Sequence, residues 1–292
     1  MEDFAETYKF IDPTGIFATK KRQELNEKHS LAGTFYPHSW HKSLEYLKGD
    51  EKVLCLGIDT SLYAKRLADK LNNDGRIFLV DYNPARMLEN RNVFTNDSRF
   101  SFCEELLWAL PFENNFFDLV ICTYTLHRIG KPKDASESSK IEAKEKVDKL
   151  LFEIKRLLQK NGTALIATHA KSSFSEILNL YWKVTKELNL IKLTNAEFKH
   201  FDGFPQEDAF RILNSIFDKV VFDEIDTSLE FNEISPFMQY WDCFPFPGFG
   251  EKDLSTEIRQ EIRKKVYEYA QNELAEKGRL KISKPSGVFI CQ

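Results

Sequence analysis

Lys52-Val-Leu-Cys-Leu-Gly57 and Arg76-Ile-Phe-Leu-Val-Asp81 are the stretches that decide the fold of this chain. Each is a short apolar run typical of a buried strand, and the runs end at a glycine and at an acidic residue. Between them, Leu67 and Leu71 recur at helical spacing, and Asn72-Asn-Asp-Gly75 supplies turn residues. The sequence therefore predicts a strand, a turn, a helix and a second strand.

The same alternation continues toward the C-terminus. Asn83-Pro84 supplies an N-cap and an N1 proline for the next helix. Further strands are expected over 100–103, 117–123 and 163–168, with a long helix ending near Gly162 before the last of them. Apolar strands alternating with helices predict an α/β fold, in which a doubly wound, mostly parallel sheet is covered by helices on both faces.

The regions outside this alternation are predicted to be additions to the same fold. Residues 1–50 are expected to form a helical preface, and aromatic-rich helices are expected over 174–188 and 207–217. The last segments, Arg279–Ile282 and Gly287–Cys291, flank turn residues and predict a terminal antiparallel hairpin.

Composition and charge exclude several classes of protein. With 41 basic and 45 acidic residues the net charge is −4, which disfavours nucleic acid as a partner. No apolar run approaches the roughly 18 residues of a membrane span and no signal peptide is evident, so a cytoplasmic location without membrane partners is expected. The 5 cysteines form no C-x-x-C pair, so reduced, mostly buried thiols and no metal site are expected.

Residues just after the strands are the candidates for ligand binding, because doubly wound sheets bind ligands at the carboxyl ends of their strands. Asp81 is placed to accept both hydroxyls of a ribose. The first turn, Gly57-Ile-Asp-Thr-Ser61, lacks the G-x-G-x-x-G pattern with which nicotinamide enzymes approach a pyrophosphate. A cofactor with a ribose and without a pyrophosphate is favoured.

Several motifs in order resemble the class I S-adenosylmethionine-dependent methyltransferases of the small-molecule type, the methyltransferase-11-like group. They are Val53-Leu-Cys-Leu-Gly57, Phe78-Leu-Val-Asp-Tyr-Asn-Pro-Ala-Arg-Met87, Leu110-Pro-Phe-Glu-Asn-Asn-Phe-Phe-Asp-Leu-Val120, Leu126-His127 and Glu153-Ile-Lys-Arg-Leu-Leu-Gln-Lys-Asn-Gly162. The resemblance implies a Rossmann-like methyltransferase fold with a seven-stranded sheet. It implies a preface (1–50) covering the site, a cofactor-binding core (51–170), and a C-terminal part (171–292) of the same domain that completes the sheet and adds substrate-cap helices.

The resemblance also implies S-adenosyl-L-methionine as cofactor, a small-molecule acceptor, and roles for individual residues. Tyr82 is expected to stack on the adenine, and Glu105, or failing that Glu104, to accept from its exocyclic amine. Leu106 and Thr123 complete the expected cofactor-binding residues. For a hydroxyl acceptor, His127 is the expected base, and Tyr36, His38 and His41 are weaker candidates to line the same cavity.

The first motif departs from the family pattern D-x-G-x-G-x-G. Cys55 replaces the acid, while Asp59 and Ser61 replace glycines. In one interpretation Asp59 attracts the cofactor ammonium in place of the missing acid; in the other, Asp59 and Thr60 cap the following helix. The departure leaves a second function open, a catalytically inactive methyltransferase-like protein that serves as a binding or scaffold module.

Overall fold

The computed structural model of the chain describes residues 16–32, 38–57, 61–130, 132, 136–190, 203–244 and 254–292, with the backbone alone for 38–40. The chain divides into two compact units. Unit 1 takes the described parts of Met1–Tyr36, Ser172–Lys199 and Asp226–Lys284. Unit 2 takes those of Pro37–Lys171, His200–Ile225 and Pro285–Gln292.

Unit 2 is built on a 7-stranded sheet of order β3-β2-β1-β4-β5-β9-β6. Its strands are β1 (Lys52–Leu56), β2 (Arg76–Val80), β3 (Phe100–Cys103), β4 (Phe117–Thr123), β5 (Leu158–Ala167), β6 (Val220–Asp226) and β9 (Pro285–Cys291). Strands β1 to β5 are parallel to one another, whereas β9 is antiparallel to β5. The predicted mostly parallel, doubly wound sheet is confirmed.

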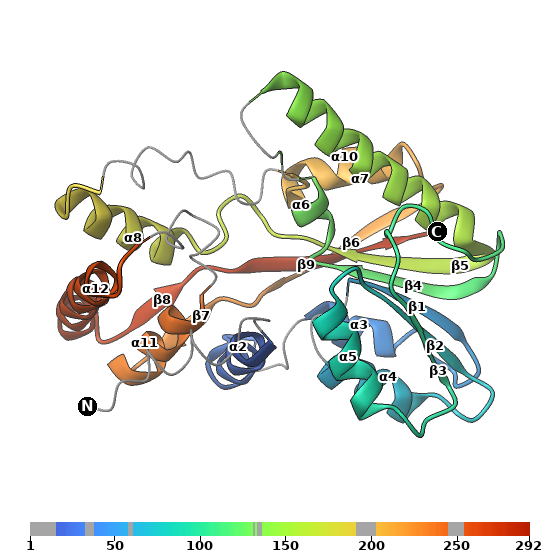
Figure 1. The fold of residues 1–292 in the computed structure, drawn as a ribbon, viewed down its shortest axis with the longest axis horizontal. Coiled ribbons are helices and arrows are strands. Elements are labelled where there is room, and N and C mark those ends of the chain that lie inside the picture. Colours follow the sequence, from blue (N-terminus) through green and yellow to red (C-terminus); the bar gives the residue numbers. More distant parts are fainter. Residues whose placement is uncertain are drawn as a thin grey trace. The chain divides into compact units, whose positions relative to one another are not determined.

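Helices cover both faces of this sheet (Figure 1). Helices α6 (Leu126–Ile129), α7 (Glu137–Leu157) and α10 (Gln206–Asn214) lie on one face. Helices α3 (His38–Leu44), α4 (Ser61–Lys70) and α5 (Pro84–Val93) lie on the other. Helix α5 begins as its sequence predicts, because the Asn83 side chain accepts from the Ala85 and Arg86 N–H groups and Pro84 occupies the first turn.

Helix α7 supplies one wall of the core. It buries one apolar stripe, Val147, Leu150, Leu151, Ile154 and Leu157. The helix ends at Leu157 and β5 begins at Leu158, so the predicted strand start at Thr163 was too late. The reason is tertiary, since Leu158 pairs with Phe117 of β4 before a shift in register, and pairing along β4 extends the strand through a polar segment.

The two C-terminal segments are both antiparallel strands, although they do not pair with each other. Strand β8 (Leu280–Ile282) pairs with β7 (Leu229–Phe231) in a separate 2-stranded sheet. Strand β9 joins the large sheet beside β5. Only two residues, Ser283 and Lys284, separate β8 from β9, so this short linker carries the chain from one sheet to the other.

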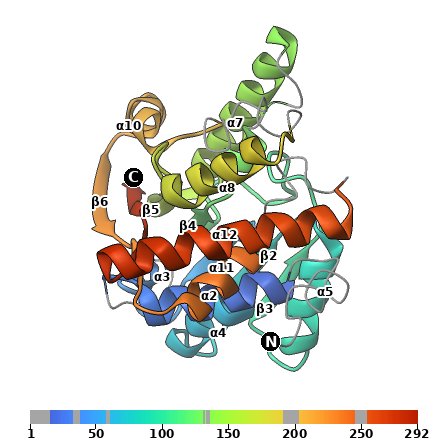
Figure 2. The same ribbon diagram turned by 90° about the vertical axis from the view of Figure 1, so that its left-hand side faces the viewer.

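Unit 1 packs helices α2 (Ile16–His29), α8 (Ser175–Glu187), α11 (Ile234–Cys243) and α12 (Thr256–Lys277) with the β7–β8 pair. Helix α12 contacts both α8 and α11, and α11 contacts α2 (Figure 2). Aromatic side chains dominate its core, among them Tyr181, Phe231 and Trp241. Among the described residues, none of the helices is long and apolar enough to cross a membrane.

We predict that Leu150→Ala lowers the free energy of unfolding by about 2–5 kcal/mol, because Leu150 is 0% exposed and its loss leaves a cavity between α7 and the sheet. Phe152→Ala on the same helix is the matched control, since Phe152 is 61% exposed. Urea unfolding of both variants measures the difference. Equal losses would contradict the assignment of this face of α7 to the core.

Candidate active site

The carboxyl ends of β1, β2 and β3 meet at one edge of the sheet in unit 2. The Gly57 N–H donates to the Val80 carbonyl at 2.9 Å, and the Asp81 N–H donates to the Cys103 carbonyl at 3.3 Å. Strand β1 also pairs with β4, so the chain turns in opposite directions from these two central strands. This is the topological switch point at which doubly wound sheets bind ligands.

Gly57 ends β1 in a conformation that requires glycine. Its φ is +76°, and a Cβ at this position would lie 2.1 Å from the Thr125 hydroxyl oxygen. That hydroxyl lies 3.1 Å from both the Leu56 carbonyl and the Thr123 carbonyl, to which it donates. Thr125 thereby ties the segment after β4 to the end of β1, a role that its sequence position did not reveal.

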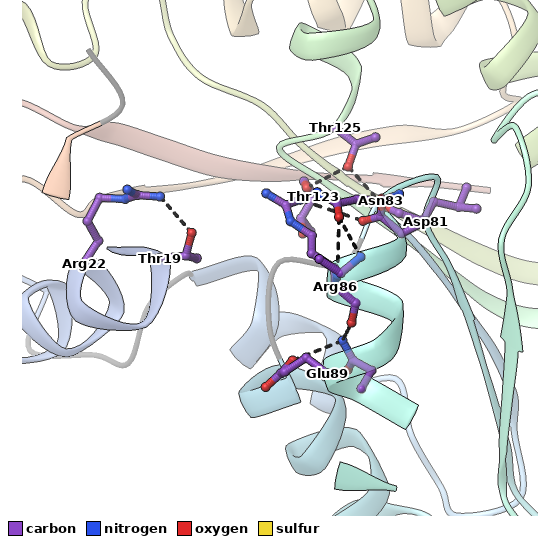
Figure 3. A network of polar contacts seen from close by, with 11 residues as sticks. Thr19, Arg22, Asp81, Asn83, Arg86, Glu89, Thr123 and Thr125 are labelled. Carbon is purple, nitrogen blue, oxygen red and sulfur yellow. Dashed lines mark hydrogen bonds and ion pairs between the residues drawn. The ribbon is translucent and has the colours of Figure 1, made fainter. Parts of the chain in front are cut away.

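Asp81 is held by its own loop and by the next helix (Figure 3). It is 1% exposed, and its Oδ1 accepts from the Asn83 N–H at 2.8 Å. The Arg86 Nη1 lies 3.8 Å from its Oδ2. These contacts orient the carboxylate and compensate part of the cost of burying its charge. Arg86 was not among the predicted residues, although its place three residues after the N-cap puts it on the first turn of α5.

A second carboxylate accepts hydrogen bonds from the first residue of α4. Glu89 of α5 accepts from the Ser61 hydroxyl at 2.7 Å and from the Ser61 N–H at 3.2 Å. A carboxylate beside a helix N-terminus is favourable because the first N–H groups have no partner inside the helix. The predicted Asp59 and Thr60 lie outside the described residues. Glu89 gave no local signal, since its contact with Ser61 spans 28 residues of sequence.

The remaining predicted cofactor residues lie in the loops after β2 and β3 and at the end of β4. Tyr82, next to Asp81, is 64% exposed, and Leu106 is 53% exposed. Glu104 forms an ion pair with Arg91 at 2.8 Å, whereas the neighbouring Glu105 is exposed and not part of that pair. Thr123 is the last residue of β4 and is half-buried.

Cys55 provides no charge at the end of β1. The side chain is 5% exposed, and burial raises the pKa of its thiol, so it is protonated and neutral near pH 7. Tyr63 of α4 lies near it and shares a 2.8 Å hydrogen bond with Ser43. The position that is acidic in the family motif is therefore neutral and apolar in this chain. All five cysteines are free, and Cys103 alone among them is not buried, as expected.

His127 lies in α6, directly beyond the end of β4, and is 3% exposed. Its ring packs edge to face on His169 with centroids 5.0 Å apart, and His169 also contacts Tyr124 at 4.5 Å. The Tyr124 hydroxyl shares a 2.7 Å hydrogen bond with Ser286. Of the preface residues, His41 is half-buried in α3, whereas Tyr36 and the His38 side chain lie outside what the structure describes.

A family model described as a methyltransferase domain matches residues 47–227, from before β1 to the end of β6. The chain belongs to this methyltransferase family. The ubiquinone/menaquinone biosynthesis C-methyltransferase of Coxiella burnetii is 24% identical over 194 residues, which cover 56% of this chain and 75% of the relative.

Two solved structures share the fold of this methyltransferase. The YcgJ protein from Bacillus subtilis has a TM-score of 0.51 at 14% identity, over 87% of this chain and 97% of its own. The phosphoethanolamine N-methyltransferase 2 of Haemonchus contortus, solved with phosphomonomethylethanolamine and S-adenosylhomocysteine, has a TM-score of 0.53 at 15% identity. That alignment covers 99% of this chain and 59% of the other.

We predict that Gly57→Ala lowers the melting temperature and weakens cofactor binding. A left-handed residue with a Cβ costs about 1–2 kcal/mol, and the contact with Thr125 adds to this cost. Gly278→Ala is the matched control, because Gly278 also has a positive φ of +70° but has nothing within 4 Å of a new Cβ. Thermal unfolding of both variants measures the difference, and a melting temperature lowered no more by Gly57→Ala than by Gly278→Ala would contradict the prediction.

Proposed function

We propose that this methyltransferase transfers the methyl group of S-adenosyl-L-methionine to a small-molecule acceptor by in-line displacement. The observation that carries the proposal is the buried Asp81 carboxylate at the switch point, oriented by the Asn83 N–H and Arg86. A carboxylate held in this way can accept hydrogen bonds from both hydroxyls of the cofactor ribose.

The other loop residues are proposed to bind the rest of the cofactor. Tyr82 is exposed beside Asp81 and is proposed to stack on the adenine. Glu105 is the preferred acceptor for the exocyclic amine, because Glu104 is already paired with Arg91. Leu106 and Thr123 are proposed to complete the pocket, and Asp59 is proposed to face the cofactor ammonium in place of the neutral Cys55.

Methyl transfer requires little acid–base catalysis from the protein. The leaving group is a neutral thioether, so rate depends mainly on holding the acceptor atom in line, about 3–3.5 Å from the methyl carbon. A hydroxyl acceptor must also lose a proton, and His127 beyond β4 is the proposed base. Its packing against His169 sets the plane of the imidazole and shields it from bulk water.

We predict that Asp81→Ala weakens binding of S-adenosylmethionine by about 1.5–3 kcal/mol, the value of a hydrogen bond to a charged group. Asp74→Ala, in the exposed turn before β2, is the control for loss of an acidic side chain. Titration calorimetry with the cofactor and with S-adenosylhomocysteine measures both variants. If the wild-type protein bound neither compound, the inactive binding or scaffold function would be the better account.

We predict that His127→Gln retains cofactor affinity but lowers turnover of a hydroxyl acceptor by roughly 10²–10⁴-fold, as expected for loss of a general base. A His127 that serves packing alone gives the opposite pattern, a lower melting temperature with normal turnover per folded molecule. Melting and turnover are measured on one preparation, with S-adenosylhomocysteine binding as the check on folding. Full turnover in the folded variant would end the assignment of His127 as base.

A further inference from the structure

Tyr124, the first residue after β4, has a left-handed backbone. Its φ is +53°, a conformation that strains a bulky residue and that asparagine tolerates better than tyrosine does. Of the four non-glycine residues with a positive φ in the described part of the chain, two are asparagines, Asn115 and Asn189. Such strain persists only where the surrounding contacts hold it, and strained residues cluster at functional sites. The contacts of Tyr124 therefore bear on the candidate active site.

The left-handed turn at Tyr124 leads the chain from β4 into α6. The Tyr124 N–H donates to the Ala167 carbonyl at 2.8 Å, which continues the pairing of β4 with β5 by one residue. The hydroxyl of the next residue, Thr125, turns back to the Thr123 carbonyl at 3.1 Å (Figure 3). The Thr125 carbonyl accepts from two N–H groups of α6 at 3.0 and 3.2 Å. Helix α6, which carries His127, thus starts from a fixed corner.

The ring of Tyr124 supports the same histidine through a second imidazole. It is tilted by 34° against the ring of His169, with centroids 4.5 Å apart, and His169 packs edge to face on His127 at 5.0 Å. Tyr124, His169 and His127 are 5%, 9% and 3% exposed. The His169 carbonyl accepts from the Gln206 N–H at 3.0 Å, so its backbone is fixed as well. In a close-packed interior, a ring held between two others turns only when a neighbour moves.

The far end of the Tyr124 side chain is tied to β9. Its hydroxyl shares a 2.7 Å hydrogen bond with the hydroxyl of Ser286, which is 2% exposed and lies near the start of β9. Strand β9 in turn pairs with β5, the strand that His169 follows. The hydrogen bond to Ser286 therefore fixes the Tyr124 ring, on which His169 packs, and His169 contacts His127. These four residues all belong to unit 2.

We propose that Tyr124 is a positioning residue for His127, acting through its left-handed backbone before α6 and through its ring on His169; this rests on the proposed role of His127 in methyl transfer. A general base works only when its nitrogen is held within hydrogen-bond reach of the proton that it takes, and a small displacement lowers the rate. A tyrosine that only fills space gains nothing from a strained backbone. In this conformation Tyr124 both turns the chain into α6 and places its ring on His169.

NMR of the histidine side chains in the full chain tests this role without an acceptor. In the wild-type protein we expect a nuclear Overhauser effect between the rings of His127 and His169, and nitrogen-15 shifts that place the His127 proton on one ring nitrogen. Tyr124→Leu is expected to lose the effect and to give a mixture of both His127 tautomers, whereas Tyr124→Phe, which retains the ring, keeps the wild-type pattern. Phe100→Leu is the matched control, because Phe100 is a similarly buried aromatic residue, 8% exposed, on β3 at the opposite end of the strand order.

Thermal unfolding of the same samples separates positioning from stability. A Tyr124→Leu protein that melts at a lower temperature but keeps the wild-type His127 spectrum would overturn the proposal, as would equal changes of that spectrum in Phe100→Leu. Tyr124→Asn repeats the test if Tyr124→Leu does not fold, because asparagine accepts a left-handed backbone while it removes the ring. S-adenosylhomocysteine binding is measured separately, and a wild-type protein that did not bind it would count against the proposed methyl transfer and leave the ring contacts decided by NMR.

Discussion

The approach of Thr125 to Gly57 is the constraint on which the candidate active site depends. The threonine hydroxyl binds the last carbonyl of β1 and the last carbonyl of β4, and so ties together the two central strands where their connections diverge. This contact leaves no room for a Cβ at position 57, where Gly57 has a left-handed φ of +76°. The end of β1 and the segment after β4 are therefore fixed to each other at this point.

The carboxylates around that point have different tasks because their surroundings differ. Asp81 is buried and held by one backbone N–H and one guanidinium, which keeps its oxygens in place for a ligand. Glu89 instead serves the N-terminus of α4 through Ser61. An acid in α5 thus stabilises the start of α4, and the neutral Cys55 adds no further negative charge.

The two units differ in how they use buried polar groups. In unit 2 the described polar contacts at the sheet edge orient backbone ends and a carboxylate around an apolar core. In unit 1 the buried side chains of Thr19, Gln23 and Asn26 lie on one face of α2, and the buried Lys284 of the linker donates to Asn26.

Much of unit 2 follows from local sequence alone. Apolar runs such as Val53–Leu56 and Ile77–Val80, each followed by a glycine or an acid, predicted the strands, a mostly parallel sheet and the position of Asp81 at a strand end. They could do so because a strand that is buried on both faces is apolar along its whole length, whichever strands it pairs with. The start of α5 was equally evident, since Asn83 and Pro84 act on their own neighbours.

Tertiary structure alone decided contacts between residues distant in sequence. The early start of β5, the separate partners of β8 and β9, and the pairing of Glu89 with Ser61 all depend on which strands and helices lie together. Lys284 is the clearest case, because a lysine in a short linker is ordinarily exposed. Only the fold, which brings it to Asn26 across 258 residues of sequence, makes it a buried amine beside a polar helix face.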